Sequence, residues 1–492
     1  MTFTSENVLL ILSVLIFSSI LISKAGYRFG LPSLLLFLVA GMLFGVDGLG
    51  LQFNDVKQAQ FIGMCSLCVI LFSGGMETKI KEIRPVLAPG LMLSTLGVVL
   101  TTVFTGLFIF VLSVWDRCPI SLPLVTCLLL AATMSSTDSA SVFNILRNSK
   151  MRLKNNLQPM LELESGSNDP MAYILTIILI QLANALTGDS AGSLDSWTVA
   201  GDVFRTLLLQ FGVGILGGAV FGFASVWFLR RVNLNNAPLY AILLLSVMFF
   251  SYTATTYLSG NGYLAVYLAG IIIGNKSIPY RKDILSFFDG MTWLVQIFMF
   301  LILGLLVNPH EMLKTGPVAL LIGIFMILVA RPLSVFISLA PFRKISMASK
   351  SFISWVGLRG AAPILFATYP VVENVEGADL IFNIVFFITL LSLIIQGSSI
   401  TGSARLLKLN EDMPEEENTF GVEVPEEAGK LVEITLTEES LLHGNTLKEL
   451  KLPEGMLVMM IKRQDKFIVP NGSVELQAGD RLLIISDHDN EG

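Results

Sequence analysis

Long apolar runs dominate this chain and constrain its fold more than any other feature. A helix needs roughly 20 apolar residues to cross a bilayer core of about 30 Å. Thirteen apolar runs follow one another, and the division between the eighth and the ninth rests on a short turn at Gly260–Gly262. They are centred near residues 7–23, 31–49, 60–76, 86–113, 120–146, 158–186, 203–229, 237–258, 261–275, 285–307, 316–340, 350–370 and 379–404. The sequence therefore predicts an all-α polytopic membrane protein with about 13 transmembrane helices.

Composition agrees with a membrane protein and excludes several other classes. The 492 residues are 53% hydrophobic and 14% charged, with a mean hydropathy of +0.72. Soluble domains carry about 25% charged residues. A net charge of −6 argues against nucleic-acid binding, which needs a basic surface. The residues before the first run include no Lys or Arg, so we expect that run to be a retained helix and not a cleaved signal peptide.

Lys and Arg residues gather in alternate loops between the apolar runs. With thirteen spans, nineteen basic residues fall in one set of loops and four in the other. The first set holds Lys24, Arg28, Lys79, Lys81, Arg84, Arg147, Lys150, Arg152, Lys154, Arg230, Arg231, Lys276, Arg281, Lys282, Arg343, Lys344, Lys350, Arg405 and Lys408, and the second holds Lys57, Arg117, Arg205 and Lys314. Because cytoplasmic loops are the basic ones, we expect the N-terminus outside and the C-terminal region in the cytoplasm.

The composition changes sharply after Leu409. Between Asn410 and Ala428 there are eight acidic residues and no basic residue, which predicts a solvated linker over 409–428. Alternating apolar residues beyond it predict strands at Leu431–Leu436, Met456–Ile461, Phe467–Val469 and Arg481–Ile485, with a short helix at Leu447–Leu450. Residues 429–492 are therefore expected to form a small α+β domain. A domain of about 60 residues is marginal on its own, so we expect it to dimerise.

Five charged residues lie deep inside the predicted spans. They are Asp138, Glu164, Asp169, Arg331 and Arg359. Each charge costs about 2.5 kcal/mol or more at the centre of a bilayer. A single carboxylate–arginine pair is compatible with a purely structural role, but three carboxylates and two arginines at similar depth indicate a transport or ion-relay site.

Two of the predicted spans carry polar or helix-breaking interruptions. Residues 135–139 in the fifth span read Ser-Ser-Thr-Asp-Ser, and residues 357–363 in the twelfth read Gly-Leu-Arg-Gly-Ala-Ala-Pro. Non-helical backbone at membrane depth persists only where protein buries it or where it lines a cavity. The fifth and twelfth spans run in opposite directions, as expected for inverted repeats with an ion site near the midplane.

The start of the sixth span supplies oxygen ligands for a small cation. Glu164 and Asn168 lie four residues apart and share one helix face, and Ser165 and Asp169 share the adjacent face. Carboxylate, hydroxyl and amide oxygens can replace the hydration shell of an alkali cation, and of these only a carboxylate can exchange a cation for a proton. None of the three histidines lies in a predicted span, so histidine is not available as the relay.

These residues resemble the monovalent cation/proton antiporters of the sodium/proton exchanger superfamily, over residues 5–405. The motifs that carry the resemblance are Thr137-Asp138, Glu164-Ser165-Gly166-Ser167-Asn168-Asp169-Pro170 and Gly357-Leu358-Arg359-Gly360. Residues 429–489 are similar to the TrkA-C (RCK-C) regulatory module and end in Gly479-Asp480-Arg481-Leu482. The combination is similar to the bacterial potassium/proton antiporter branch, which implies a multi-pass protein of the bacterial plasma (inner) membrane.

The resemblance also implies which residues bind the transported ions. Asp169 matches the carboxylate that binds a monovalent cation and a proton in turn, so the metal expected here is a monovalent cation at Asp169. Thr137, Asp138 and Ser165 match the surrounding ligands. Asn168 stands where electrogenic relatives have a second aspartate, which implies electroneutral exchange of one cation for one proton.

The resemblance also implies residues that position these ligands without contacting the ion themselves. Glu164 and Asn168 match this position, and Glu164 is expected to pair with either Arg359 or Arg331. The sequence leaves the choice between the two arginines open. Ser139 follows Asp138 where many relatives carry proline, so the form of the helix break differs from the usual pattern.

The expected protein is therefore a secondary active antiporter and not an enzyme. It would exchange cytoplasmic K⁺ for external H⁺ by alternating access around Asp169, with Na⁺ as an alternative cation and no further cofactor. We expect a transmembrane domain over 1–408, the acidic linker over 409–428 and a regulatory domain over 429–492. Its expected partners are membrane lipids and a second copy of the chain, with no nucleic acid.

Several alternatives remain open at the level of sequence. The membrane motifs are shared with Na⁺/H⁺ antiporters, and a passive cation channel would also need charged residues in the membrane. The regulatory domain is expected to bind a nucleotide such as cyclic-di-AMP, unless it serves dimerisation alone. An intramembrane protease would leave the arginine-bearing twelfth span unexplained.

Overall fold

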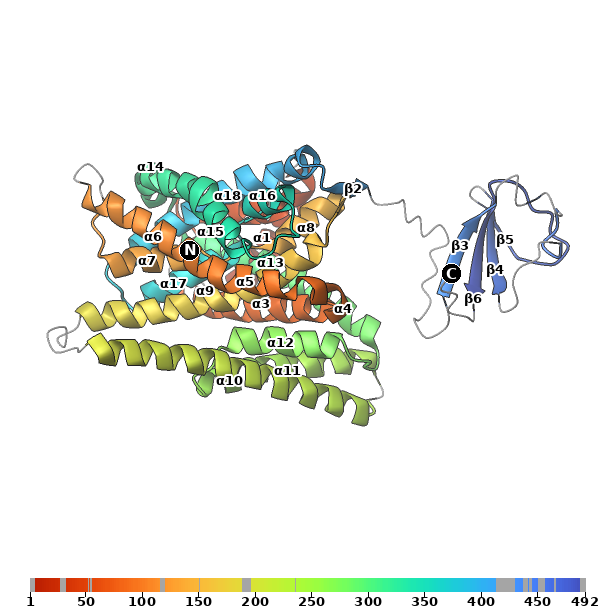
Figure 1. Ribbon diagram of the computed structural model, residues 1–492, viewed down its shortest axis with the longest axis horizontal. Coiled ribbons are helices and arrows are strands. Elements are labelled where there is room, and N and C mark those ends of the chain that lie inside the picture. The colour runs from red at the N-terminus through yellow and green to blue at the C-terminus, as the bar shows by residue number, and fades with distance from the viewer. Residues whose placement is uncertain are drawn as a thin grey trace. The chain divides into compact units, whose positions relative to one another are not determined.

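The computed structural model describes residues 5–26, 32–51, 53, 55–115, 120–149, 151–187, 196–234, 236–412, 430–436, 441, 445–449, 456–463 and 466–486. The chain separates into two compact units, Met1–Asp412 and Met413–Gly492 (Figure 1). Residues 410–412 of the predicted acidic linker belong to the first unit, and residues 413–428 lie outside the described residues.

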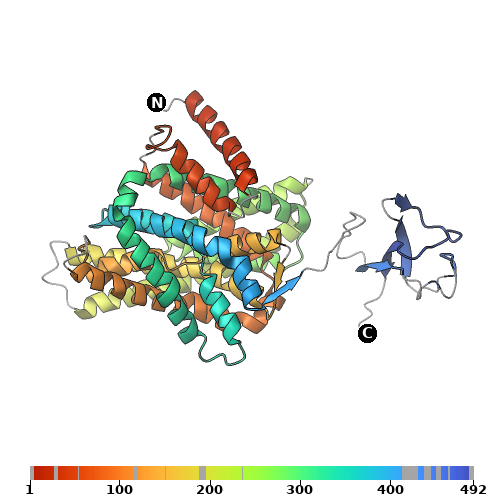
Figure 2. The ribbon, with the colours of Figure 1, turned by 90° about the horizontal axis from the view of Figure 1, so that it is seen from above.

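The first unit is built almost entirely of helices. Its uninterrupted helices are α1 (Ser5–Gly26), α2 (Ser33–Phe44), α3 (Val56–Glu77), α9 (Leu157–Thr187), α10 (Ser196–Arg231), α11 (Ala237–Tyr257), α12 (Gly262–Gly274), α13 (Arg281–Leu306) and α18 (Ala378–Leu406). The long helix α18 runs through the middle of the unit in Figure 2. Within the described residues, eight helical stretches are long and apolar enough to cross a membrane, and five shorter helices are apolar.

Two long helical stretches each contain a π-helical segment. The first consists of α4 (Ile80–Ile83), a 3-10 turn (Arg84–Val86), α5 (Leu87–Met92), the π-helix η3 (Leu93–Gly97) and α6 (Val98–Val114). The second consists of α14 (Pro309–Phe325), the π-helix η4 (Met326–Ala330) and α15 (Arg331–Ser338). The hydroxyls of Thr101 and Ser334, which follow the two π-helices, form a 2.8 Å hydrogen bond. π-Helical turns are rare and are often found at functional sites.

Two further helix pairs are separated by non-helical backbone. Helix α7 (Leu124–Thr133) and α8 (Ser139–Asn148) flank residues 135–138, and α16 (Met347–Trp355) and α17 (Ala361–Val372) flank residues 357–360. These are the two places where the sequence predicts interruptions. The two non-helical segments lie side by side, because the Asp138 amide donates to the Leu358 carbonyl at 2.8 Å.

The buried apolar side chains of the first unit form two cores. The larger one joins α2, α7, α8, α13 and the helices from α14 to α18. The smaller one joins α3 and the helices from α10 to α13, and α10, α11 and α12 form a layer along one side of the unit (Figure 1). Helix α9 contributes to both cores. Strand β1 (Met151–Leu153), between α8 and α9, pairs antiparallel with strand β2 (Asn410–Asp412). This short sheet joins the start of the predicted linker to the helical unit.

The second unit is a four-stranded antiparallel sheet. Strands β3 (Lys430–Thr435), β4 (Met456–Arg463), β5 (Lys466–Ile468) and β6 (Arg481–Ser486) lie in the order β3-β6-β4-β5. Their positions match the predicted strands to within two residues. The predicted helix at Leu447–Leu450 is wrong over the described residues, because 447–449 form a turn. Its backbone bonds to Val474 and Gly472 instead of continuing as a helix.

Candidate functional site

Asp138 lies at the point where the two non-helical segments meet. It is the N-cap of α8, and its carboxylate accepts hydrogen bonds from the Ser141 amide at 3.1 Å and from the Ser141 hydroxyl. The start of α17 packs directly against it, since a Cβ atom placed on Gly360 would lie 2.8 Å from Asp138 Cβ and closer still to its carboxylate. The N-termini of α8 and α17 therefore both carry partial positive charge beside this carboxylate.

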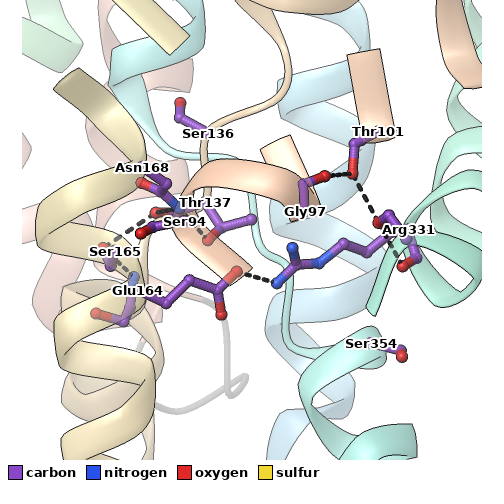
Figure 3. Close-up of polar contacts among 12 residues, drawn as sticks. Ser94, Gly97, Thr101, Ser136, Thr137, Glu164, Ser165, Asn168, Arg331 and Ser354 are labelled. Carbon is purple, nitrogen blue, oxygen red and sulfur yellow. Dashed lines mark hydrogen bonds and ion pairs between the residues drawn. The ribbon is translucent and has the colours of Figure 1, made fainter. Parts of the chain in front are cut away.

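The polar face of α9 is oriented toward this helix break. The Ser165 hydroxyl donates to the Thr137 carbonyl at 3.0 Å and accepts from the Ser139 amide at 3.1 Å. The Asn168 amide nitrogen donates to the Thr137 hydroxyl at 2.6 Å, and Figure 3 shows both side chains reaching toward Thr137. The structure thus brings Ser165 and Asn168 of α9 together with Thr137 and Asp138 of the non-helical segment, as the sequence predicts.

Asp169 follows Asn168 on α9 and is partly exposed. The Asp138 carboxylate and the Ser136 side chain are the charged and polar groups that interact with the Asp169 carboxylate. Within the described part of the chain, neither Asp138 nor Asp169 forms an ion pair with a Lys or Arg. Two neighbouring carboxylates with the hydroxyls of Ser141 and Ser136 beside them, and no ion-paired Lys or Arg among the described residues, can bind an external cation or share protons.

The structure settles the pairing of Glu164, which sequence left open between two arginines. The Glu164 carboxylate forms a buried ion pair with the Arg331 guanidinium, and both side chains are at most 2% exposed (Figure 3). Arg359 instead donates through Nη1 to the carbonyls of Ser135 at 3.2 Å and Ser136 at 2.5 Å. Arg359 therefore satisfies backbone carbonyls freed where α7 ends.

Two residues of α18 that sequence reasoning missed hold the second helix break. The Ser392 hydroxyl accepts from the Arg359 amide at 2.9 Å, and Gln396 donates to the Trp355 carbonyl at 2.7 Å. Ser392 also donates to Gln396 at 2.6 Å. Polar residues four apart within an apolar helix would have been a usable signal, because they share one face.

The structure also shows a cavity that is separate from this site. That cavity, of about 490 Å³, lies between α9 and α10 and is lined by Gln181, Asp202 and Arg205 among others. None of the residues described above lines it. The candidate site is thus distinct from this cavity.

Long apolar helices, with two partly exposed carboxylates that have no cationic partner among the described residues at a break between helix ends, are the features of a secondary active membrane transporter. The family model described as "Sodium/hydrogen exchanger, transmembrane" matches residues 11–405, and the "TrkA-C domain" model matches residues 431–491. The chain belongs to the sodium/hydrogen exchanger family and carries a C-terminal TrkA-C domain.

Curated relatives cover nearly the whole chain. It is 39% identical to the K(+)/H(+) antiporter NhaP2 of Shewanella sp. (strain MR-4), over 95% of this chain and 79% of the relative. It is 38% identical to the K(+)/H(+) antiporter NhaP of Alkalimonas amylolytica, over 97% of this chain and 80% of the relative. The solved sodium proton antiporter MjNhaP1 of Methanocaldococcus jannaschii superposes with a TM-score of 0.66 at 22% identity, covering 80% of this chain and 100% of that chain. That likeness shows a shared fold.

Proposed function

We propose that the protein is an antiporter that exchanges cytoplasmic K⁺ for external H⁺. The cluster of Asp169, Asp138, Thr137 and Ser165 around the helix break carries this proposal, because it offers oxygen ligands and negative charge with no resident protein cation. The names of the two relatives at 38–39% identity support K⁺ as the cation.

Exchange would follow from competition for Asp169. A carboxylate in a partly desolvated site can hold either a proton or a cation, so one displaces the other without a separate coupling device. Thr137 is held in place by Asn168 and Ser165, which fixes the positions of its oxygen atoms beside the helix break. Asn168 stands where electrogenic members of the family have a second aspartate, and this resemblance supports the exchange of one cation for one proton with no net charge movement.

Alternating access would use the two halves of the helical unit as inverted repeats. The described residues contain eight candidate spans and five shorter apolar helices. In each half, a helix with a π-helical segment is followed by a helix broken by irregular backbone and then by a long continuous helix. This repeated order supports two oppositely oriented copies of one unit around a central ion site.

The placement in the membrane follows from the loop charges. The N-terminus would lie outside the bacterial plasma membrane, and the TrkA-C domain would lie in the cytoplasm. We propose a homodimer, in which this domain binds a regulatory nucleotide such as cyclic-di-AMP.

Proton movement in proteoliposomes tests the proposal. Dissipation of a pH gradient would be followed on adding K⁺, Na⁺ or Li⁺, with and without a clamped membrane potential. We expect K⁺-driven proton movement that the clamp leaves unchanged. A response to Na⁺ alone would make the protein a Na⁺/H⁺ antiporter of the same fold, and potential-dependent flux without proton movement would make it a passive channel.

A further inference from the structure

The cavity between α9 and α10 is lined by both charged and apolar side chains. It lies where the second half of α9 runs beside the first half of α10 (Figure 1). Asp202, Arg205 and Gln210 of α10 supply polar groups, and Leu182 of α9 and Val203 of α10 supply apolar ones. A cavity of about 490 Å³ with both kinds of lining suits an amphiphilic ligand.

The two charges and one amide of this cavity lack protein partners among the described residues. Asp202 and Arg205 are exposed, and neither forms an ion pair within that part of the chain. The side-chain amide oxygen of Gln210 is buried, and no described residue bonds to it. A buried polar group without a partner is costly, so a ligand that bonds to this amide removes that cost.

The other end of α10 indicates how deep the cavity lies in a bilayer. The Arg231 guanidinium carbon lies 5.3 Å from the ring centre of Trp227, and Trp and Arg at a helix end are typical of the membrane interface. A bilayer core of about 30 Å takes roughly 20 helical residues, so a core that begins at Trp227 ends between Gln210 and Arg205. Gln210 therefore lies at the edge of the hydrocarbon, and Arg205 and Asp202 lie at the level of the lipid headgroups.

The first half of α10 also carries an exposed apolar face beside the cavity. Helix α10 is the least buried of the eight candidate spans. Phe204 and Leu208, which lie between cavity-lining residues in the sequence, are 63% and 59% exposed. In a membrane, such a face contacts the acyl chains of lipids. The molecules that reach the cavity from this side are therefore lipids and not soluble metabolites.

The polar residues of the cavity follow the order of the groups in an amine-bearing phospholipid. At a rise of about 1.5 Å per residue, Arg205 lies about 4.5 Å and Gln210 about 12 Å closer to the hydrocarbon than Asp202. Phosphatidylethanolamine presents an ammonium group, a phosphate and glycerol esters in the same order from the membrane surface inward. A carboxylate accepts from an ammonium, a guanidinium donates two parallel hydrogen bonds to a phosphate, and an amide NH₂ donates to an ester carbonyl.

We propose that this cavity binds the headgroup of a phospholipid with a primary amine, such as phosphatidylethanolamine. A choline headgroup has no N–H to donate to Asp202, and quaternary ammonium groups are held by aromatic rings, whereas no described aromatic residue lines the cavity. A phosphatidylglycerol headgroup brings a negative charge beside Asp202 and no ammonium to neutralise it. The lipid site is separate from the ion site and does not depend on which cation is exchanged.

Native mass spectrometry of the full-length protein tests this site. The delipidated protein in detergent is titrated with dioleoyl-phosphatidylethanolamine, dioleoyl-phosphatidylcholine or dioleoyl-phosphatidylglycerol. We expect phosphatidylethanolamine to bind about tenfold more tightly than either other lipid, equivalent to about 1.4 kcal/mol. Arg205→Gln should weaken its binding about tenfold, because the phosphate loses its bidentate partner. Asp202→Ala removes the acceptor for the ammonium group, so this variant should bind phosphatidylethanolamine and phosphatidylcholine equally.

Lys314→Gln and Asp379→Ala are the matched controls, because each removes one charge from an exposed residue outside the cavity. Both should bind the three lipids as the wild type does. Equal binding of the three lipids by the wild type would overturn the proposal. Wild-type binding by both Arg205→Gln and Asp202→Ala would also overturn it, because the lipid would then bind elsewhere. Glycerophosphoethanolamine, which lacks acyl chains, should bind more weakly than the lipid, and equal binding would make the ligand a soluble molecule.

Discussion

At the scale of the residue, the buried charges fall into partnered and unpartnered groups. Arg331 is neutralised by Glu164, and Arg359 is bound to backbone carbonyls, whereas Asp138 and Asp169 have no cationic partner among the described residues. We therefore expect the partnered groups to stabilise the fold and the unpartnered carboxylates to bind the transported ion. The two roles predict different responses to mutation.

Asp169→Asn should abolish exchange while leaving the protein folded. The amide keeps the size of the side chain, but it can neither release a proton nor neutralise a cation. We expect no K⁺-dependent dissipation of a pH gradient and a melting temperature within a few degrees of the wild type. Asp379→Asn, an exposed carboxylate in the first turn of α18, is the control and should exchange at the normal rate. Substantial exchange by Asp169→Asn would exclude this carboxylate as the ion-binding group.

Glu164→Ala should mainly reduce stability. Removing one member of a buried ion pair leaves an uncompensated charge and costs about 3–5 kcal/mol. The double variant Glu164→Leu with Arg331→Met removes both charges and should recover most of that loss. Thermal unfolding of the three purified proteins in one detergent measures the effect. Equal melting temperatures for the wild type and Glu164→Ala would contradict a structural role for the pair.

The residue types of the site were predictable from sequence, but their pairing was not. Polar and charged residues inside apolar spans identify Thr137, Asp138 and Asp169 without any structure. The choice between Arg331 and Arg359 as partner of Glu164 depends on which guanidinium is close in space. Both arginines are equally unusual in the sequence, so only tertiary packing separates them.

At the scale of the element, the helix breaks are defined by their contacts with each other. The bond from the Asp138 amide to the Leu358 carbonyl joins segments more than 200 residues apart, and Gly360 lets α17 approach Asp138. The breaks themselves were predictable from polar residues and glycines in apolar spans. The π-helices η3 and η4 were not predicted, because they share no sequence signal: η3 contains Ser94 and Thr95, η4 is wholly apolar, and neither contains proline.

Gly360→Ala should disturb this contact directly. Its methyl group would overlap the Asp138 carboxylate, so either α17 or Asp138 must move. We expect a loss of exchange rate of about tenfold or more, equivalent to about 1.4 kcal/mol. Gly402→Ala is the control, because a Cβ atom there meets no atom within 4 Å and the helix α18 gains stability from alanine. A normal exchange rate in Gly360→Ala would mean that the contact with Asp138 is dispensable.

The C-terminal sheet depends on one buried carboxylate. Burial acts to raise the pKa of Asp480, but the hydrogen bonds from Arg463, at 2.8 and 2.7 Å, and from the Gln477 amide outweigh it and hold the pKa below its usual value. A carboxylate with a lowered pKa stabilises the fold above about pH 3.9 and loses this contribution as the pH falls further. Asp480→Asn should destabilise the sheet by about 1–3 kcal/mol. Hydrogen exchange of β6 in the full-length protein should become faster, and unchanged exchange would contradict this prediction.

At the scale of the whole molecule, the candidate ion site and the TrkA-C domain belong to separate units. All the residues of the candidate ion site lie within Met1–Asp412, whereas the TrkA-C match lies within Met413–Gly492. The sequence predicted this division from the change in composition after Leu409. It did not predict that residues 410–412 would form β2 and pair with β1, because an acidic tripeptide carries no strand signal.

Removal of residues 413–492 should therefore leave cation/proton exchange intact and abolish the proposed response to a nucleotide. The truncated protein keeps the whole ion site and the β1–β2 pair, so we expect its KM for K⁺ to match the full-length protein within about twofold, or about 0.4 kcal/mol. Adding cyclic-di-AMP to the cytoplasmic face should change the exchange rate of the full-length protein and not that of the truncated one. If neither protein responds and the full-length chain alone is dimeric by light scattering, the TrkA-C domain serves dimerisation. If the truncated protein loses exchange while staying folded, the domain is part of the transport machinery and the division into two units does not extend to function.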